Sequence, residues 1–166
     1  MRLVWSVLVL MLSSINAHAQ APRVDRVDIF EYGLYTAEVN SEVTAPDTAA
    51  GKMILLNNIQ HTVTTRTVPA QLGVHFGFRY TVVGAPPEAT VRLHMVTIFP
   101  APGLSAPDNP QRQPRSEYDL ARAIGAQLYR DYTFEHDWEL LPGVWTFQIW
   151  YEGRMLAEEK FTVVRQ

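Results

Sequence analysis

The segment FEHDWEL carries three carboxylates at alternate positions. If it is a β-strand, Glu135, Asp137 and Glu139 share one face, with about 6.6 Å between successive side chains. Paired carboxylates roughly 5–9.5 Å apart serve as acid and base in glycosidases, so a hydrolase that uses one of them is an alternative function. A straight row does not converge on a cation such as calcium, and nothing in the sequence indicates a sugar cleft. We therefore interpret the row as a solvated outer face, paired with arginines such as Arg79 or Arg92 across the sheet.

Two histidines could bind a metal. His75 and His94 fall on the polar faces of two predicted strands, residues 72–84 and 90–99, which we expect to be antiparallel neighbours. In register, their imidazoles would be presented together to zinc or copper. A metal site needs a third and a fourth ligand, and neither is visible near them. We predict surface histidines without a metal, and a periplasmic metal-binding protein is the alternative function.

Nucleophilic catalysis has no support in the sequence. There is no cysteine, and no Gly-x-Ser-x-Gly motif is present. We predict no catalytic residue and no cofactor, and therefore that the protein is not an enzyme.

The N-terminus has the form of a secretory signal peptide. A positive Arg2 precedes an apolar run over residues 3–12, and residues 17–19, Ala-His-Ala, match a cleavage site. The run is too short to span a bilayer, which takes about 20 apolar residues. We predict cleavage after Ala19, a single domain over residues 20–166, and a periplasmic or secreted location.

The amino-acid composition argues against two classes of binding partner. The formal net charge of −3 argues against nucleic acid or an anionic membrane surface, because both attract basic proteins. Without cysteine there is no disulfide framework, so an exported chain of this kind must be stabilised by its core.

Alternating apolar residues predict a β-rich chain. LGVHFGFRYTVVG (72–84) and TVRLHMVTIF (90–99) are the clearest strands. Many short strands and frequent turn signals favour an antiparallel two-sheet β-sandwich.

Two segments are less regular. Residues 100–115 contain five prolines and predict an extended loop. In residues 116–131, Leu120, Ile124 and Leu128 recur every four positions, which favours one short amphipathic helix. Gly125 would cost that helix about 1 kcal/mol, so a pair of short edge strands is the competing interpretation.

The strand GVWTFQIWYEG places two tryptophans on opposite faces. Trp145 shares a face with Phe147, Ile149 and Tyr151, whereas Trp150 points the other way. We favour a structural role for Trp150 beneath the proline-rich loop or the 116–131 segment. The alternatives are partial exposure at a sheet edge, or a patch with Tyr151 that docks a partner, since interface hot spots favour Trp and Tyr.

Three stretches carry a family resemblance: VPAQLGVHFGFRYTVVG, FPAPG and ELLPGVWTFQIWYEGRMLAEEKFTV. Together they resemble the bacterial exported proteins classed as domain of unknown function 3859. The resemblance implies an immunoglobulin-like sandwich, an extracytoplasmic location and no established activity, and it supplies no catalytic residues. We predict an exported, non-enzymatic binding or structural module in the periplasm. Its partner would be an envelope protein or envelope component, met by loops at one end of the sandwich or by an uncovered sheet edge.

Overall fold

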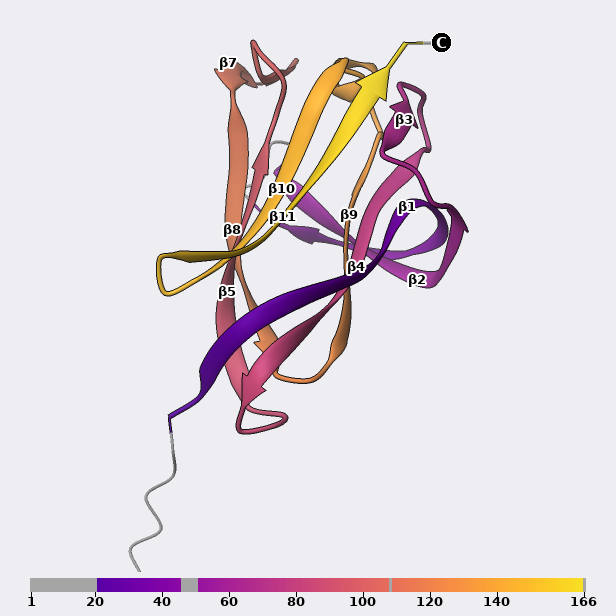
Figure 1. Ribbon diagram of the computed structural model, residues 1–166. Coiled ribbons are helices and arrows are strands. Elements are labelled where there is room, and N and C mark those ends of the chain that lie inside the picture. The colour runs from indigo at the N-terminus through magenta and orange to yellow at the C-terminus, as the bar shows by residue number, and fades with distance from the viewer. Residues whose placement is uncertain (1–20, 46–50, 108, 166) are drawn as a thin grey trace, which may run out of the picture.

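A computed structural model describes residues 21–45, 51–107 and 109–165 and shows a chain built almost wholly of strands (Figure 1). The predicted signal peptide, residues 1–19, lies outside these ranges. In chain order the elements are β1 (Arg23–Thr44), β2 (Lys52–Val63), β3 (Thr67–Pro69), β4 (His75–Ala85), β5 (Thr90–Ile98), β6 (Leu104–Ala106), β7 (Asn109–Gln113), β8 (Arg115–Ala123), β9 (Gln127–Thr133), the 3-10 helix η1 (Asp137–Glu139), β10 (Gly143–Tyr151) and β11 (Arg154–Val164). None of the described residues forms a helix long and apolar enough to cross a membrane.

Two sheets pack face to face. The four-stranded sheet has the order β2-β1-β4-β9, and the five-stranded sheet has the order β3-β11-β10-β5-β8. Their pairings are antiparallel, except that β3 runs parallel to β11. The predicted all-β, immunoglobulin-like sandwich is therefore confirmed.

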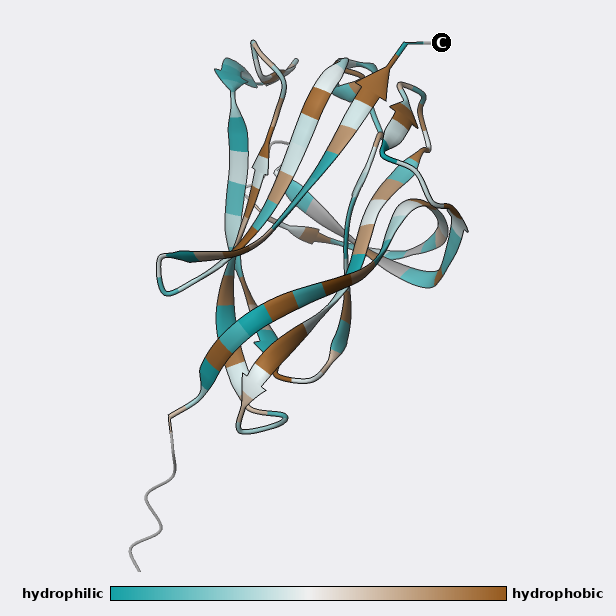
Figure 2. Cartoon of the chain, in the orientation of Figure 1, coloured by the Kyte–Doolittle hydropathy of each residue, from teal (hydrophilic) through white to brown (hydrophobic). Residues whose placement is uncertain are grey.

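The core lies between the inner faces of the two sheets. Phe76 of β4 is fully buried, and its ring lies 5.8 Å from the rings of Trp145 and Phe147 and 5.4 Å from the ring of Phe161. The Trp145 indole donates its N–H to the Leu141 carbonyl at 2.9 Å, so its only polar atom is satisfied. Apolar and polar residues alternate along the strands (Figure 2), as period-two packing requires. Leu72, which begins the alternating segment 72–84 and shares its apolar face with Phe76 by parity, precedes β4 and is exposed.

The expected pairing of β4 with β5 is wrong. β4 belongs to the four-stranded sheet and β5 to the five-stranded sheet, so the segment between them crosses from one layer to the other. Alternation identifies which face of a strand is buried but not which strand lies beside it. The four residues 86–89 suffice to cross the roughly 10 Å between stacked sheets.

The predicted helix over residues 116–131 is also wrong, and the competing interpretation is correct. The segment forms β8 and β9, which are edge strands of opposite sheets. A recurrence every four residues fits a strand as well as a helix, because four is a multiple of two. Gly125 turns the chain at φ +87° and donates its N–H to Val82 O at 2.8 Å.

The proline-rich segment is more regular than the predicted loop. β6 and β7 pair into a small hairpin, and Leu104 is buried against the core. β8 begins at Arg115, where the loop was expected to end.

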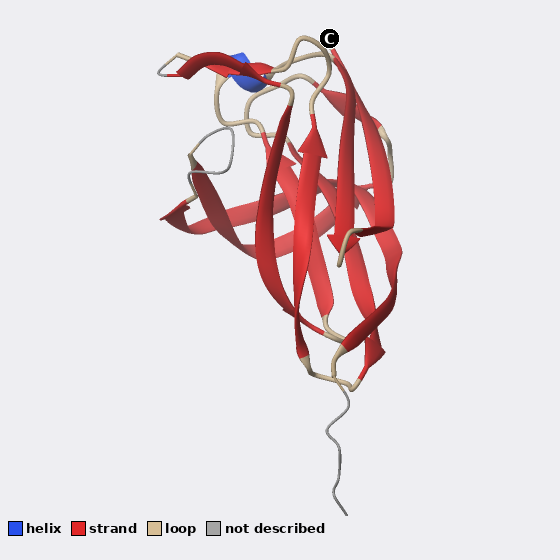
Figure 3. Ribbon diagram, turned by 90° about the vertical axis from the view of Figure 1, so that its left-hand side faces the viewer, coloured by secondary structure: helices blue, strands red, loops and turns tan. Residues whose placement is uncertain are grey.

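The distal half of the β1–β2 hairpin leaves the sheet. Residues 36–44 and 52–60, called here the hairpin arm, run across the direction of the other strands (Figure 3). Register shifts between Leu34 and Tyr35 and at two further places in β1 provide the bend, since bulges twist and bend a strand. Two contacts place the arm over the four-stranded sheet: Arg79 donates to Ile59 O at 2.7 Å, and Lys52 lies 3.4 Å from Glu135.

Arginines bridge the two sheets at both open sides of the sandwich. On the β1 side, Arg66 pairs with Glu159 at 2.6 Å and stacks 3.8 Å above the Tyr32 ring. On the other side, Arg130 of β9 reaches across to the five-stranded sheet and donates to Val96 O at 2.9 Å.

Candidate functional site

The three predicted carboxylates do not form a row. β9 ends at Thr133, and Asp137–Glu139 form helix η1, so FEHDWEL is not a strand. Only 2% of Glu139 is exposed, which contradicts the predicted solvated face. Glu135 instead pairs with Lys52, and Asp137 is exposed.

Glu139 serves as a buried hydrogen-bond acceptor. Its Oε2 accepts the backbone N–H groups of Glu135 at 2.6 Å and His136 at 2.8 Å, while Oε1 accepts the Tyr132 hydroxyl at 2.8 Å. Burial raises the pKa of the Tyr132 phenol well above its usual value, and the Glu139 carboxylate adds to the shift. The carboxylate is thus engaged in closing the turn after β9 rather than facing a substrate cleft.

The arginines proposed as partners of that row lie elsewhere. Arg79 pairs with Glu31 at 3.0 Å, and Arg92 lies 3.8 Å from Asp119.

His75 and His94 lie in different sheets, so the structure does not bring them together. Nδ1 of His75 is 2.7 Å from the Thr133 hydroxyl, and Nδ1 of His94 is 2.9 Å from Asp119. No group of three or more His, Cys, Asp or Glu side chains in the described ranges is arranged to hold a metal ion. The metal-binding hypothesis required the two imidazoles to lie side by side on neighbouring strands, and the structure does not place them so.

Trp150 lies in the central strand of the five-stranded sheet and points outward. His94 of β5 and Met155 of β11 are its partners in the register, so their side chains flank the indole. Its indole N–H donates to Gln148 Oε1 at 3.0 Å, and the residue is half-buried. The proline-rich segment, which we favoured as its cover, lies at the other end of β10, where Pro100 abuts Gly143.

Tyr151 does not join Trp150 in one patch. It packs against the core on the opposite face of β10, and its hydroxyl donates to Pro22 O at 3.2 Å.

The outer face of the five-stranded sheet, along β10 from Val144 to Trp150, combines apolar and charged groups. Ile98, Val144 and Met155 are 38%, 48% and 46% exposed. Charges of both signs surround them, including Glu158 with Lys160 at 2.8 Å and Arg115 with Glu117 at 3.4 Å. We call this surface the Trp150 face, and it comprises His94, Ile98, Val144, Gln148, Trp150 and Met155.

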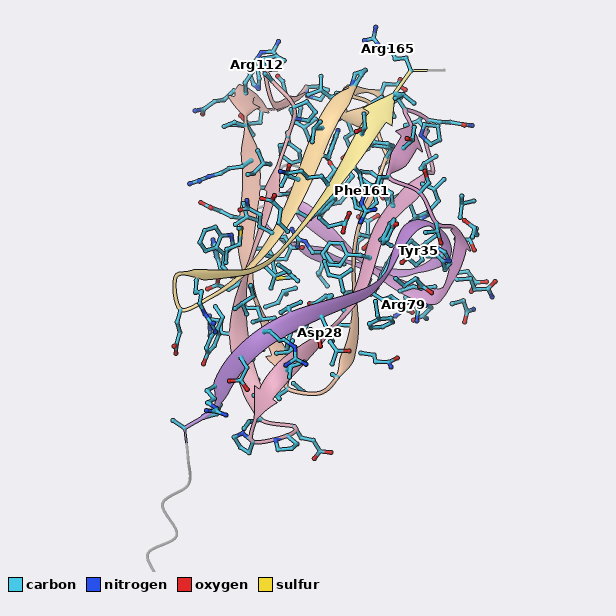
Figure 4. The ribbon with its side chains drawn as sticks, in the orientation of Figure 1. Asp28, Tyr35, Arg79, Arg112, Phe161 and Arg165 are labelled. Carbon is cyan, nitrogen blue, oxygen red and sulfur yellow. The ribbon has the colours of Figure 1, made fainter. Side chains whose placement is uncertain are left out.

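A second cluster lies beneath the hairpin arm, on the outer face of the four-stranded sheet. The Tyr35 and Tyr129 rings meet at 4.8 Å in an edge-to-face contact, and Arg79 lies on the same side of the molecule (Figure 4). Burial raises the pKa of both phenols, with Glu31 adding to the shift for Tyr35 and Asp131 for Tyr129. Both phenols are therefore neutral, and their rings pack against each other beneath the arm.

Sequence reasoning missed this cluster because the arm returns over the sheet only through the bulges in β1. Gly33 was the available signal: a Cβ there would lie 1.9 Å from Val63 O, so the close approach of β1 and β2 requires glycine.

Comparisons with known proteins agree with this architecture. The family described as "Domain of unknown function (DUF3859)" matches residues 23–163. An immunoglobulin-like protein from Pseudomonas aeruginosa is similar with a TM-score of 0.57 and 25% identity, covering 89% of this chain and 99% of that chain. No curated protein matches.

One further solved structure is much less similar. It is an alkylpurine DNA glycosylase, AlkC, from Pseudomonas fluorescens, bound to DNA containing an abasic site analog. Its TM-score is 0.36 at 14% identity, covering 60% of this chain and 28% of that one. Similarity at that level carries no information on nucleic-acid binding.

Proposed function

This chain belongs to the family described as domain of unknown function DUF3859, and we propose that it is an exported, non-enzymatic binding module. In this proposal it contacts a protein partner in the periplasm through the Trp150 face.

The observation that carries the proposal is the difference between the two outer faces. The hairpin arm lies over the four-stranded sheet and engages Arg79 through Ile59 O. The described elements place no comparable layer over the five-stranded sheet, where the exposed Met155 lies beside Trp150 and the exposed Ile98 and Val144 lie further along the same face.

The composition of the Trp150 face supports a protein as its partner. Trp and Met are enriched in protein interfaces, and energetic hot spots centre on Trp with a polar rim around them. The mixed charges around Trp150 and the net charge of −3 do not attract a polyanion.

A non-enzymatic role is supported by the positions of the chemically capable side chains. The Glu139 carboxylate accepts hydrogen bonds from backbone N–H groups. His75 and His94 are hydrogen-bonded to Thr133 and Asp119, respectively, in separate sheets.

Export is tested by determining the N-terminus of the protein recovered from a periplasmic fraction. The signal pattern predicts a chain that begins at Gln20. A chain that retains residues 1–19, or that is recovered only with the cytoplasm, would contradict export.

Binding is tested on native gels of envelope extracts that contain the epitope-tagged full chain. The wild type is expected to migrate as a complex, and Trp150→Ala as the free protein. Phe30→Ala is the matched control, because Phe30 is an exposed aromatic residue of β1 outside the Trp150 face. Equal migration of the wild type and a folded Trp150→Ala variant would overturn the proposal.

A further inference from the structure

The outer face of the five-stranded sheet carries charges at the ends of two neighbouring rows. Residues paired in register lie side by side across the strands and point to the same face. One row, called here the basic row, runs from β8 to β11 through Arg115, Ile98, Thr146 and Lys160. The next row, called the acidic row, runs through Glu117, Val96, Gln148 and Glu158. The basic row therefore has a cation at each end, and the acidic row has an anion at each end.

The four terminal charges are accessible to a partner. Their side chains are between 31% and 60% exposed, and each cation pairs only along its own strand, Arg115 with Glu117 and Lys160 with Glu158. An ammonium or guanidinium group has several donors, and a carboxylate has about four acceptor sites. Each of these groups can therefore take a second partner of opposite charge from another molecule.

A two-fold axis midway between the two rows makes this face complementary to itself. The axis lies in the plane of the interface and runs perpendicular to the strands, so it lays the basic row of one copy on the acidic row of the other. Arg115 of one copy then faces Glu117 of the other, and Lys160 faces Glu158. The two-fold repeats both ion pairs.

The same rotation brings apolar groups together. Successive outward side chains of a strand are about 6.6 Å apart, so Val144 and Trp150 each lie about 10 Å from the axis along β10, in opposite directions. Val144 of one copy therefore meets Trp150 of the other. Met155, the register partner of Trp150, likewise meets Thr162, the register partner of Val144.

The other face-to-face two-fold is opposed by charge. An axis parallel to the strands, between β5 and β10, exchanges the two ends of each row. It sets Arg115 against Lys160 and Glu117 against Glu158, and like charges brought together across an interface cost binding energy. The charge pattern thus selects one dimer geometry.

The area available fits a weak, reversible dimer. β5, β8 and β10 have nine residues each and β11 has eleven. With strands about 4.8 Å apart and a rise of about 3.3 Å per residue, they offer roughly 19 Å by 30 Å, or about 570 Å². A standard stable interface buries about 800 Å² per partner, so we expect association that depends on protein concentration.

We propose that the partner of the Trp150 face is a second copy of this chain, joined face to face about a two-fold axis perpendicular to the strands. This dimer rests on the proposed function, since it occupies the same surface and gives that surface its partner. Two-fold dimers are the commonest protein oligomers. The two outer faces would stack as twisted sheets commonly do, about 10 Å apart.

Sedimentation velocity of the purified mature chain, over a wide range of concentrations, tests the dimer. The wild type is expected to associate reversibly. Glu158→Lys or Lys160→Glu alone is expected to raise the dimer Kd at least tenfold, because each variant brings like charges together across the axis. An equimolar mixture of the two variants is expected to recover association, because each then supplies the charge that the other has lost.

Asp28→Lys is the matched control. Asp28 forms an exposed ion pair at 2.8 Å with Arg26, two residues away on β1 of the other sheet, and its reversal should leave the dimer Kd unchanged. Single reversals that self-associate like the wild type, or a mixture that fails to recover association, would overturn the dimer. A purified chain that is monomeric throughout, while the complex on native gels still depends on Trp150, would exclude the dimer and leave the proposed function in place.

Discussion

At the scale of single residues, Glu139 joins the end of β9 to helix η1. One carboxylate accepts three hydrogen bonds: two from the backbone N–H groups of Glu135 and His136, which lie beyond the end of β9, and one from the Tyr132 hydroxyl. Because each donor is buried or partly buried, removal of the acceptor charge leaves polar groups without equivalent partners.

Glu139→Gln is expected to lower the free energy of unfolding by about 1–3 kcal/mol, since an amide cannot accept at both of its ends. Urea denaturation measures the change. Asp137→Asn is the control in the same helical turn, and its exposed side chain predicts a change within about 0.5 kcal/mol. Equal losses in the two variants would show that Glu139 has no special role.

The buried tyrosines predict a loss of stability at alkaline pH. Burial raises the pKa values of Tyr35, Tyr129 and Tyr132 above the unfolded value of 10.0. The folded state therefore keeps protons that the unfolded state loses, so this contribution is complete below pH 10 and is lost as pH rises further.

Absorbance at 295 nm, recorded together with circular dichroism, tests that expectation. Tyr35, Tyr129 and Tyr132 should ionise only as the sheet signal disappears. Ionisation of all seven tyrosines with an intact fold would contradict the assigned burial.

At the scale of elements, the hairpin arm depends on a small number of contacts with the sheet. Arg79 links it to the sheet through Ile59 O and is oriented by Glu31. Arg79→Met is expected to release the arm, so hydrogen exchange should accelerate along β2 while β10 and β11 keep their protection.

Arg26→Met is the control for the arm. Its ion pair with Asp28, at 2.8 Å, is exposed and lies on β1 before the arm. Unchanged exchange along β2 in Arg79→Met would show that the arm is held by other contacts.

At the scale of elements, sequence patterns could predict the buried face of a strand but not its neighbours. Alternation in residues 72–84 predicts one apolar face, and Phe76, Phe78 and Tyr80 of that face are buried in the core; it also set Trp150 opposite Trp145. It could not decide sheet membership, because β4 and β5 have the same pattern whether they pair side by side or face each other across the core. Odd–even alternation also wrongly predicted that Glu139 lies on a solvated strand face. The strand ends at Thr133, and no local residue signals that end.

At the scale of the whole molecule, the candidate sites depend on which strands pair and on how the two sheets stack. A single sequence shows neither. Trp150 could be assigned to an outer face, but its neighbours His94 and Met155 come from strands paired at long range. The hydrogen bonds of Arg130 to Val96 O and to the Tyr118 hydroxyl likewise arise only because β9 and β8 enter different sheets.

The outer face of one sheet is covered by the chain itself, whereas the described elements leave the outer face of the other sheet uncovered. The hairpin arm shields the four-stranded sheet, and the Trp150 face remains available on the other layer. A protein partner that recognises this module would therefore meet the five-stranded sheet.

Site-specific photo-cross-linking in living cells tests that claim most directly. A benzophenone amino acid replaces Met155 on the Trp150 face or Leu72 on another surface, two apolar residues with matched exposures of 46% and 47%. We predict a discrete protein adduct from position 155 that is lost when Trp150→Ala is added, and none from position 72. Equal adducts from both positions, or an adduct at 155 that survives Trp150→Ala, would contradict the account.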